Sequence, residues 1–148
     1  MKKASLLLLG FSLLLYACNS TSNKTEEHAE HLPSETSELT LNNGAKWKAD
    51  SITNHNVVAL KTIADNFRIK PAPSVNDYQL LGSDLKNGLD KMIRECKMTG
   101  ADHEALHHWL NPLLKENKEL ESVTDTVVAK PVFNSIDKQL DEYHNYFE

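Results

Sequence analysis

Hydrophobic residues recur at three- and four-residue spacing in four stretches of the chain after residue 50. This spacing places side chains on one face of an α-helix, so it predicts four amphipathic helices. No stretch alternates apolar and polar residues over more than a few positions, so no extended strand is predicted. The predicted inward faces are Ile52, Asn56, Leu60, Ile63 and Phe67; Tyr78, Leu81, Leu85, Leu89, Met92 and Cys96; Leu106, Leu110, Leu113 and Leu114; and Phe133, Ile136, Leu140, Tyr143 and Phe147.

Capping and breaking residues set the expected boundaries of the first two helices. The first helix is predicted from about Asp50 to Arg68, because two prolines follow it closely. The second is predicted to begin at Ser74, since Ser74 with Asp77 three residues later forms a capping-box-like start.

The boundaries of the last two helices rest on similar signals. Thr99 with Asp102 predicts the start of the third helix, and Pro112 within its pattern predicts a kink or a break. The fourth is predicted to begin near Pro131, a favourable first-turn residue, after a longer polar connection over residues 118–130. The 110 residues of 39–148 therefore predict an all-α, up-down four-helix bundle.

The first 17 residues have the features of a bacterial signal peptide. Two lysines at positions 2 and 3 precede an apolar run that ends at Leu15 and is too short to span a bilayer. The following Leu15-Tyr16-Ala17-Cys18 resembles a lipobox. That resemblance implies cleavage before Cys18 and diacylation of its sulfur, which is enough for stable anchoring. The alternative is a plain secretory signal with a chance cysteine.

Residues 18–38 are predicted to be the lipidated cysteine followed by a disordered tether. The segment is rich in Ser, Thr, Asn and Glu and has almost nothing apolar to bury. Its two histidines, His28 and His31, could hold a metal weakly, but a solvated linker is the favoured interpretation. The expected location is therefore the cell envelope, with the domain in the periplasm or on the outer surface.

Charge and cysteine content narrow the possible functions. Loss of the two leader lysines changes the formal charge from −5 to −7, with 14 basic and 21 acidic residues, which argues against nucleic acid and against a polybasic membrane patch. Lipidation of Cys18 would leave Cys96 as the only thiol, so no intramolecular disulfide is expected. In an oxidising compartment Cys96 should be buried, bound to a metal, or paired with another chain.

An up-down bundle would bring several metal-ligating side chains to one end. His103 and His107 lie about 40° apart on the third helix and should face the core side, whereas His108 should face solvent. Two imidazoles at i and i+4 can share a metal, and sulfur groups add soft ligands. The hypothesis is a copper or zinc site formed by Cys96, Met98, His103, His107 and His144, with Asp50 and the less favourable His55 at the same end.

Two other readings of the same residues stay open. A non-covalent b-type haem could bind through His103 or His107 with Met92, Met98 or His144; the sequence has no C-x-x-C-H for covalent attachment, and Gly82 and Gly88 could leave room. Alternatively, the histidines and Cys96 are ordinary packing at the end of a structural or protein-interaction module. Catalysis is not expected, because no nucleophile elbow, paired inward carboxylates or phosphate-binding loop accompanies Cys96.

A wider pattern resembles a set of small secreted or lipidated proteins of Bacteroidetes-type bacteria. It consists of Cys96-x-Met98-Thr99-Gly100-x-x-His103-x-x-Leu106-His107-x-Trp109-Leu110, the upstream Asn43-Gly44-x-Lys46-Trp47, and the closing Tyr146-Phe147. The resemblance covers residues 39–148 and implies a helical periplasmic domain, but no activity or binding residues. The sequence thus predicts a non-enzymatic binding role, with the membrane and a cell-envelope protein as partners.

Overall fold

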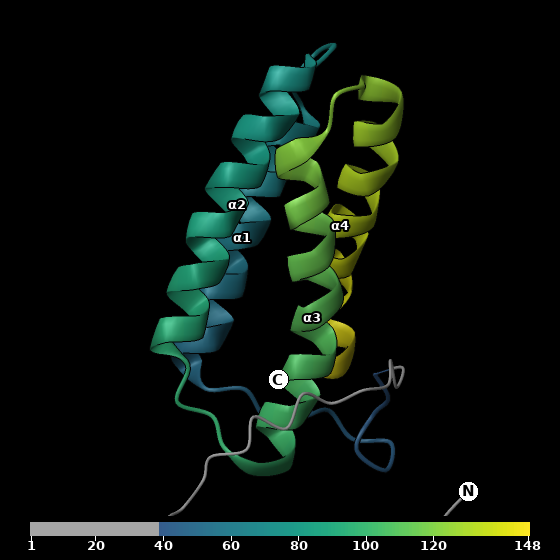
Figure 1. Cartoon of the computed structure of the whole chain (residues 1–148). Helices are drawn as coiled ribbons and strands as arrows, with labels where there is room; N and C mark the ends of the chain where they lie inside the picture. The colour runs from purple at the N-terminus through teal and green to yellow at the C-terminus, as the bar shows by residue number, and fades with distance from the viewer. Residues whose placement is uncertain (1–38) are drawn as a thin grey trace, which may run out of the picture. The chain divides into compact units, whose positions relative to one another are not determined.

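A computed structural model describes residues 39–148, which form four helices (Figure 1). They are α1 (Ser51–Arg68), α2 (Val75–Glu95), α3 (Gly100–Ser122) and α4 (Thr126–Tyr146). In this part of the chain, strand-like pairing is limited to two isolated bridges. The prediction of an all-α four-helix fold is therefore confirmed. The predicted signal peptide, Cys18 and the tether with His28 and His31 lie outside the described residues.

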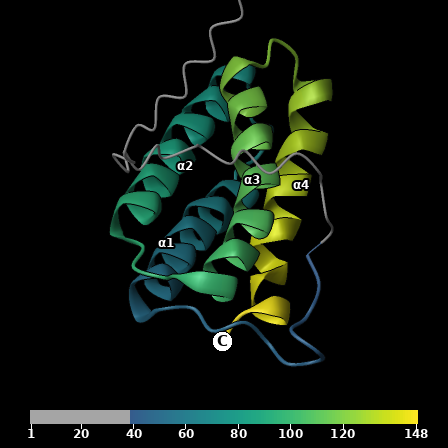
Figure 2. The same cartoon turned by 60° about the horizontal axis from the view of Figure 1, so that its bottom comes forward.

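Successive helices alternate direction and pack on their sequence neighbours (Figures 1 and 2). α1 also contacts α4, which closes the bundle, and α2 contacts α4 across it. One end of the bundle consequently contains the start of α1, the end of α2, the start of α3 and the end of α4. This is the convergence of elements on which the candidate site depends.

The predicted inward faces form most of the core, with one shift in α1. Ile52, predicted to point inward, is 37 % exposed, and the first buried residue of α1 is Thr53. Val57 and Ala64 complete the inward face of α1, which is shifted by about one residue from the predicted face. The largest fully buried side chains include Leu60, Leu85, Leu89, Met92, Leu113, Leu120, Ile136, Leu140, Tyr143 and Phe147.

Of the kink or break predicted at Pro112, a break does not occur, and the long third connection was wrong. α3 runs through Pro112 to Ser122, and only residues 123–125 separate it from α4. The Asp125 side chain accepts a hydrogen bond from the Val127 N–H at 2.8 Å and starts α4 five residues before Pro131. Buried Leu120 and Ala129 continue the core through residues 118–130, which were predicted to form a polar connection. The contacts that α3 makes with the core offset the backbone hydrogen bond that Pro112 cannot donate.

Two glycines allow α2 to approach its neighbours closely. A Cβ atom on Gly82 would lie 2.9 Å from both the backbone nitrogen and Cγ of Glu121 in α3. A Cβ atom on Gly88 would lie 2.7 Å from Cδ2 of Leu60 in α1. The space beside each glycine is therefore filled by a neighbouring helix and does not provide the room for haem that the sequence analysis considered.

The entry segment, residues 39–50, ties the start of the domain to its C-terminus. The Trp47 N–H donates to the Tyr146 carbonyl at 2.8 Å, and the Glu148 N–H donates to the Trp47 carbonyl at 2.9 Å. The Ala49 N–H donates to the Glu148 carbonyl at 2.9 Å. These bonds form a short parallel bridge across the bundle end, with the partly buried Trp47 packed against the core.

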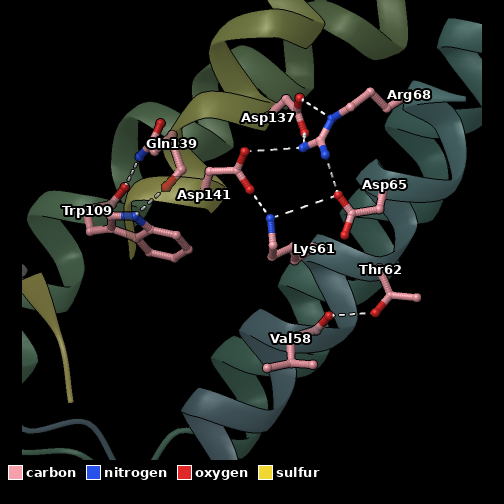
Figure 3. Close-up of polar contacts among 9 residues, drawn as sticks. All are labelled: Val58, Lys61, Thr62, Asp65, Arg68, Trp109, Asp137, Gln139 and Asp141. Carbon is pink, nitrogen blue, oxygen red and sulfur yellow. Dashed lines mark hydrogen bonds and ion pairs between the residues drawn. The ribbon is translucent and has the colours of Figure 1, made fainter. Parts of the chain in front are cut away.

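A charge network joins α1 to α4 along one side of the bundle (Figure 3). The Arg68 guanidinium donates to both Asp137 oxygens, at 2.8 and 2.5 Å, and also contacts Asp65 and Asp141. Lys61 completes the network by bonding to Asp141. Bidentate geometry and several shared carboxylates make this more than an isolated surface pair. It aligns two helices that the chain does not connect directly.

Candidate functional site

The junction between α2 and α3 is held by one carboxylate at the start of α1. Asp50 accepts hydrogen bonds from the Thr53 N–H at 2.6 Å and from the Lys97 N–H at 2.9 Å. Burial alone would raise the pKa of Asp50, but these backbone donors outweigh it and hold the pKa below its usual value. Asp50 therefore caps α1 and fixes the backbone that follows Cys96.

The predicted cap of α3 differs from what the structure shows. Thr99 stands at the N-cap position, but its side chain makes no capping hydrogen bond. The Asp102 carboxylate instead accepts from the Lys48 N–H at 2.9 Å, which ties the entry segment to α3. Gly100, with φ +67°, makes the backbone turn between the two helices. The junction is thus stabilised by contacts distant in sequence rather than by a local capping box.

Three of the predicted ligands come together as a line. Cys96 Sγ lies 3.7 Å from Nδ1 of His103, and Nε2 of His103 lies 2.9 Å from Nε2 of His107. Cys96 is the C-cap of α2, whereas the histidines occupy successive turns at the start of α3. Their ring centroids are 4.4 Å apart with an interplanar angle of 64°. His103 is the middle member and uses a different ring nitrogen toward each neighbour.

The burial of the histidines differs from the sequence prediction. His107 is exposed, although it was expected on the core side, and His108 is half-buried, although it was expected to face solvent. The reason is that buried Ala105 and Trp109 turn the inward face of α3 toward their side of the helix. Although His107 is exposed, the protein atoms around its ring partly desolvate it and so lower its pKa. The nearby imidazoles of His103 and His108 lower it further, while Glu104 opposes them.

Met98 and His144 do not join this line. Met98 is partly buried and packs against the hydrophobic core. His144 is exposed, and its ring contacts the Tyr143 ring at a centroid distance of 5.3 Å. The inner position on α4 belongs to Tyr143, because Tyr143 rather than His144 continues the apolar face.

Tyr143 is a polar residue of this bundle end that was not among the predicted site residues. It is fully buried, and its hydroxyl donates to the Asn54 side-chain oxygen at 2.9 Å. Burial raises the pKa of Tyr143 well above its usual value, and the negative charge of Asp50 raises it further. Tyr143 stays protonated and supports the wall behind the junction. The sequence signal for its burial was the position of Tyr143 on the predicted apolar face of the fourth helix.

His55 lies outside the line, on the outer surface of α1. Together with Ser51 and Ile52 it borders an open depression of about 450 Å³, whose other side is formed by Arg94, Glu95 and Lys97 of the α2 end. Glu95 is engaged there by the Asn56 amide, which donates to it at 2.9 Å. The depression is a surface feature beside the junction and brings no further ligand to the histidine pair.

Within residues 39–148, no three or more His, Cys, Asp or Glu side chains are grouped so that they could hold one metal ion. The five-residue ligand set is therefore not assembled as a single shell in the described part of the chain. The arrangement offers a two-nitrogen chelate, His103 with His107, and a thiol on the far side of His103. Met92, a possible haem ligand from the sequence, is 1 % exposed and packed in the core.

Comparisons with protein-family models, curated proteins and solved structures find no match to this chain. Among the helices of residues 39–148, none combines the length and apolar character needed to cross a bilayer.

Proposed function

We propose that this chain is a membrane-anchored lipoprotein whose periplasm-facing helical domain has a non-enzymatic binding role, and that it binds copper or zinc through His103 and His107. The anchor part of the proposal is supported by the lipobox-like Leu15–Cys18 and the short apolar leader before it. The metal part is supported by the geometry of the histidine pair.

The observation that carries the metal proposal is the 2.9 Å separation of the two Nε2 atoms. Metal–imidazole bonds of about 2.0–2.1 Å, at ligand angles of about 90–110°, place two ligand nitrogens roughly 2.9–3.4 Å apart. The pair, joined by an N–H···N hydrogen bond when no ion is bound, therefore already has the nitrogen separation that a shared ion requires. His107 is exposed, so an ion can reach the pair from solvent. The remaining coordination positions would be open to water or to ligands from a partner.

The test is a metal titration of the full chain extracted from membranes and purified without a His tag. Copper(II) and zinc(II) affinities are measured by competition with a chelator for the wild type and for His103→Ala/His107→Ala. The matched control is His55→Ala/His144→Ala, which removes two exposed histidines outside the pair. We expect the first double variant to lose the site and the control to keep it. Equal binding by all three proteins would refute the proposal.

A protein-interaction module is the alternative, and a separate observation favours it. At the other end of the bundle, around the α1–α2 and α3–α4 turns, large apolar side chains are exposed: Ile69, Leu80, Val127 and Val128. Contiguous exposed apolar patches mark surfaces that contact other proteins, and this alternative takes these four side chains as one such surface. If the titration gives no metal binding, cross-linking in cells with Ile69→Glu/Val127→Glu compared with wild type would test this alternative. Loss of a specific cross-linked partner in the variant would support it.

A further inference from the structure

His103 faces two partners with opposite parts of its ring. Nδ1 lies 3.7 Å from Cys96 Sγ, whereas Nε2 lies 2.9 Å from His107 Nε2. A metal ion shared by the two Nε2 atoms would lie on the side of His103 away from the sulfur. A zinc–sulfur bond is about 2.3 Å and a zinc–nitrogen bond about 2.0–2.1 Å, so a thiolate on the same ion would have to approach Nε2, not Nδ1. The arrangement therefore separates the thiol from the two-nitrogen chelate.

We infer that Cys96 is a positioning residue that acts through His103, and that the histidine pair takes copper(II) with nitrogen ligands and no sulfur–metal bond. This inference rests on the proposed function. The Nδ1–H of His103 donates to Cys96 Sγ, and in the metal-free protein the Nε2 lone pair of His103 then accepts the Nε2–H of His107. An incoming ion takes the place of this proton, which moves to Nδ1 of His107, so that both Nε2 lone pairs face the ion. Metal-binding histidines commonly have their second ring nitrogen held in this way, and the partner fixes both the tautomer and the ring orientation.

The sulfur is well placed for this role because its backbone is held on both sides. The Cys96 N–H donates to the Met92 carbonyl at 2.9 Å, which closes the last turn of α2. The next residue, Lys97, donates its N–H to Asp50 at 2.9 Å. Cys96 is also half-buried against the core, which limits its motion. Cys96 is thus a fixed acceptor against which His103 is oriented.

The spacing of the pair favours a planar ion. With metal–nitrogen bonds of about 2.0–2.1 Å, neighbouring positions at 90° give a nitrogen–nitrogen distance of roughly 2.9 Å, whereas a tetrahedral angle gives roughly 3.3–3.4 Å. The observed 2.9 Å matches the first value. Tetragonal geometry with nitrogen and oxygen ligands is typical of copper(II) and nickel(II). Zinc(II) would require the two rings to move apart.

The experiment compares the wild-type full chain with Cys96→Ser, Cys96→Ala and His103→Ala/His107→Ala, all extracted from membranes and free of a His tag. Copper(II) affinity is measured by chelator competition, and the copper(II) form is examined by absorption and electron paramagnetic resonance. Nickel(II), which has the same planar preference, serves as a redox-inert probe for counting the reactive thiol after loading. Circular dichroism establishes that each variant is helical.

We expect Cys96→Ala to weaken copper(II) binding by about 10- to 100-fold, the usual effect of removing an outer partner of a metal-binding histidine. Cys96→Ser should retain most of the affinity, because a hydroxyl still accepts from Nδ1–H. The resonance spectrum should be axial with coupling to two nitrogens. Absorption should show no thiolate-to-copper charge transfer, and nickel(II) loading should leave the thiol reactive.

Three results would overturn the inference while leaving the proposed function intact. They are a thiolate-to-copper absorption band, loss of the reactive thiol on nickel(II) loading, and equal affinities for wild type and Cys96→Ala. The first two would make Cys96 a direct ligand, and the third would leave it without a role at the site. Failure of the proposed function is a different result, in which His103→Ala/His107→Ala binds copper(II) as tightly as the wild type.

Discussion

Replacing Gly82 by alanine tests whether the close contact between α2 and α3 determines how tightly the bundle packs. The added Cβ would lie 2.9 Å from the Glu121 backbone nitrogen and 3.2 Å from its Cα. Backbone atoms cannot rotate away, so α2 and α3 must separate locally. The buried hydrogen bond from the Asn117 amide to the Gly82 carbonyl, 3.0 Å long, would be strained by the same movement.

The size of the effect follows from opposing contributions. Alanine is better than glycine inside a helix by about 1 kcal/mol. Overpacking a tight contact costs about 1–3 kcal/mol. Weakening a buried hydrogen bond costs about 1 kcal/mol more. Gly82→Ala should therefore lower the free energy of unfolding by about 1–3 kcal/mol, which corresponds to a drop in melting temperature of roughly 4–8 °C per kcal/mol.

Urea and thermal denaturation followed by circular dichroism would measure this change. Gly88→Ala is the matched comparison, because its Cβ would meet Cδ2 of Leu60 at 2.7 Å, the end of a flexible side chain rather than backbone. Leu60 can change rotamer, so Gly88→Ala should cost less than Gly82→Ala. The reasoning would be refuted by a Gly82→Ala protein as stable as the wild type, or by a larger loss at Gly88.

Three further predictions concern the bundle ends and the anchor. Asp50→Ala removes a helix cap and the support of the α2–α3 junction, so it should lower the free energy of unfolding by about 1–2 kcal/mol or more. Asp125 accepts from one backbone N–H in the described part of the chain, so Asp125→Ala should cost less in the same denaturation assay. The Asp77 carboxylate bonds to Lys70 and to the backbone and side chain of the helix cap, which lowers its pKa from 3.8 to about 2. The contribution of this carboxylate to stability should be fully present above about pH 4 and lost as the pH falls through about 2. Lys70→Met removes the main cause of the lowered pKa, so its urea midpoint should depend less on pH between about 5 and 2 than that of the wild type. Cys18→Ser should move the protein from the membrane fraction to the soluble fraction and remove the lipid mass in mass spectrometry; a membrane-bound variant would argue against lipidation.

The sequence was sufficient to predict the helices because the apolar spacing is regular where the core is continuous. Leu81, Leu85, Leu89 and Met92 all occupy the inward face that the pattern assigned to them. The start of α4 was predicted too late because Pro131 is a favourable first-turn residue, and the connection before it was predicted too long because buried Leu120 and Ala129 were not recognised as core. Tertiary burial of those two side chains decides the length of α3 and α4, and local propensity does not report it.

The candidate site was predictable only in part, because topology can be read from the sequence and side-chain direction cannot. Topology brought Cys96, His103 and His107 to one bundle end, as expected. Small errors in the predicted rotation of each helix about its axis then account for the ligands that do not reach the site. Tyr143 takes the inner position of α4 and leaves His144 exposed, since one residue corresponds to 100° of rotation around a helix. The opposed use of the two nitrogens of His103 depends on ring orientation, which spacing does not specify.

The bridge between the entry segment and the C-terminus determines where a reporter can be attached. Because Trp47 is hydrogen-bonded to Tyr146 and Glu148, a tag fused after Glu148 would emerge beside the point where the chain enters the domain. Such a tag would follow directly on the backbone that makes these hydrogen bonds and would strain the bridge. The α3–α4 turn, residues 123–125, lies at the opposite end of the bundle (Figure 1). A short epitope inserted there would leave both the bridge and the histidine pair undisturbed.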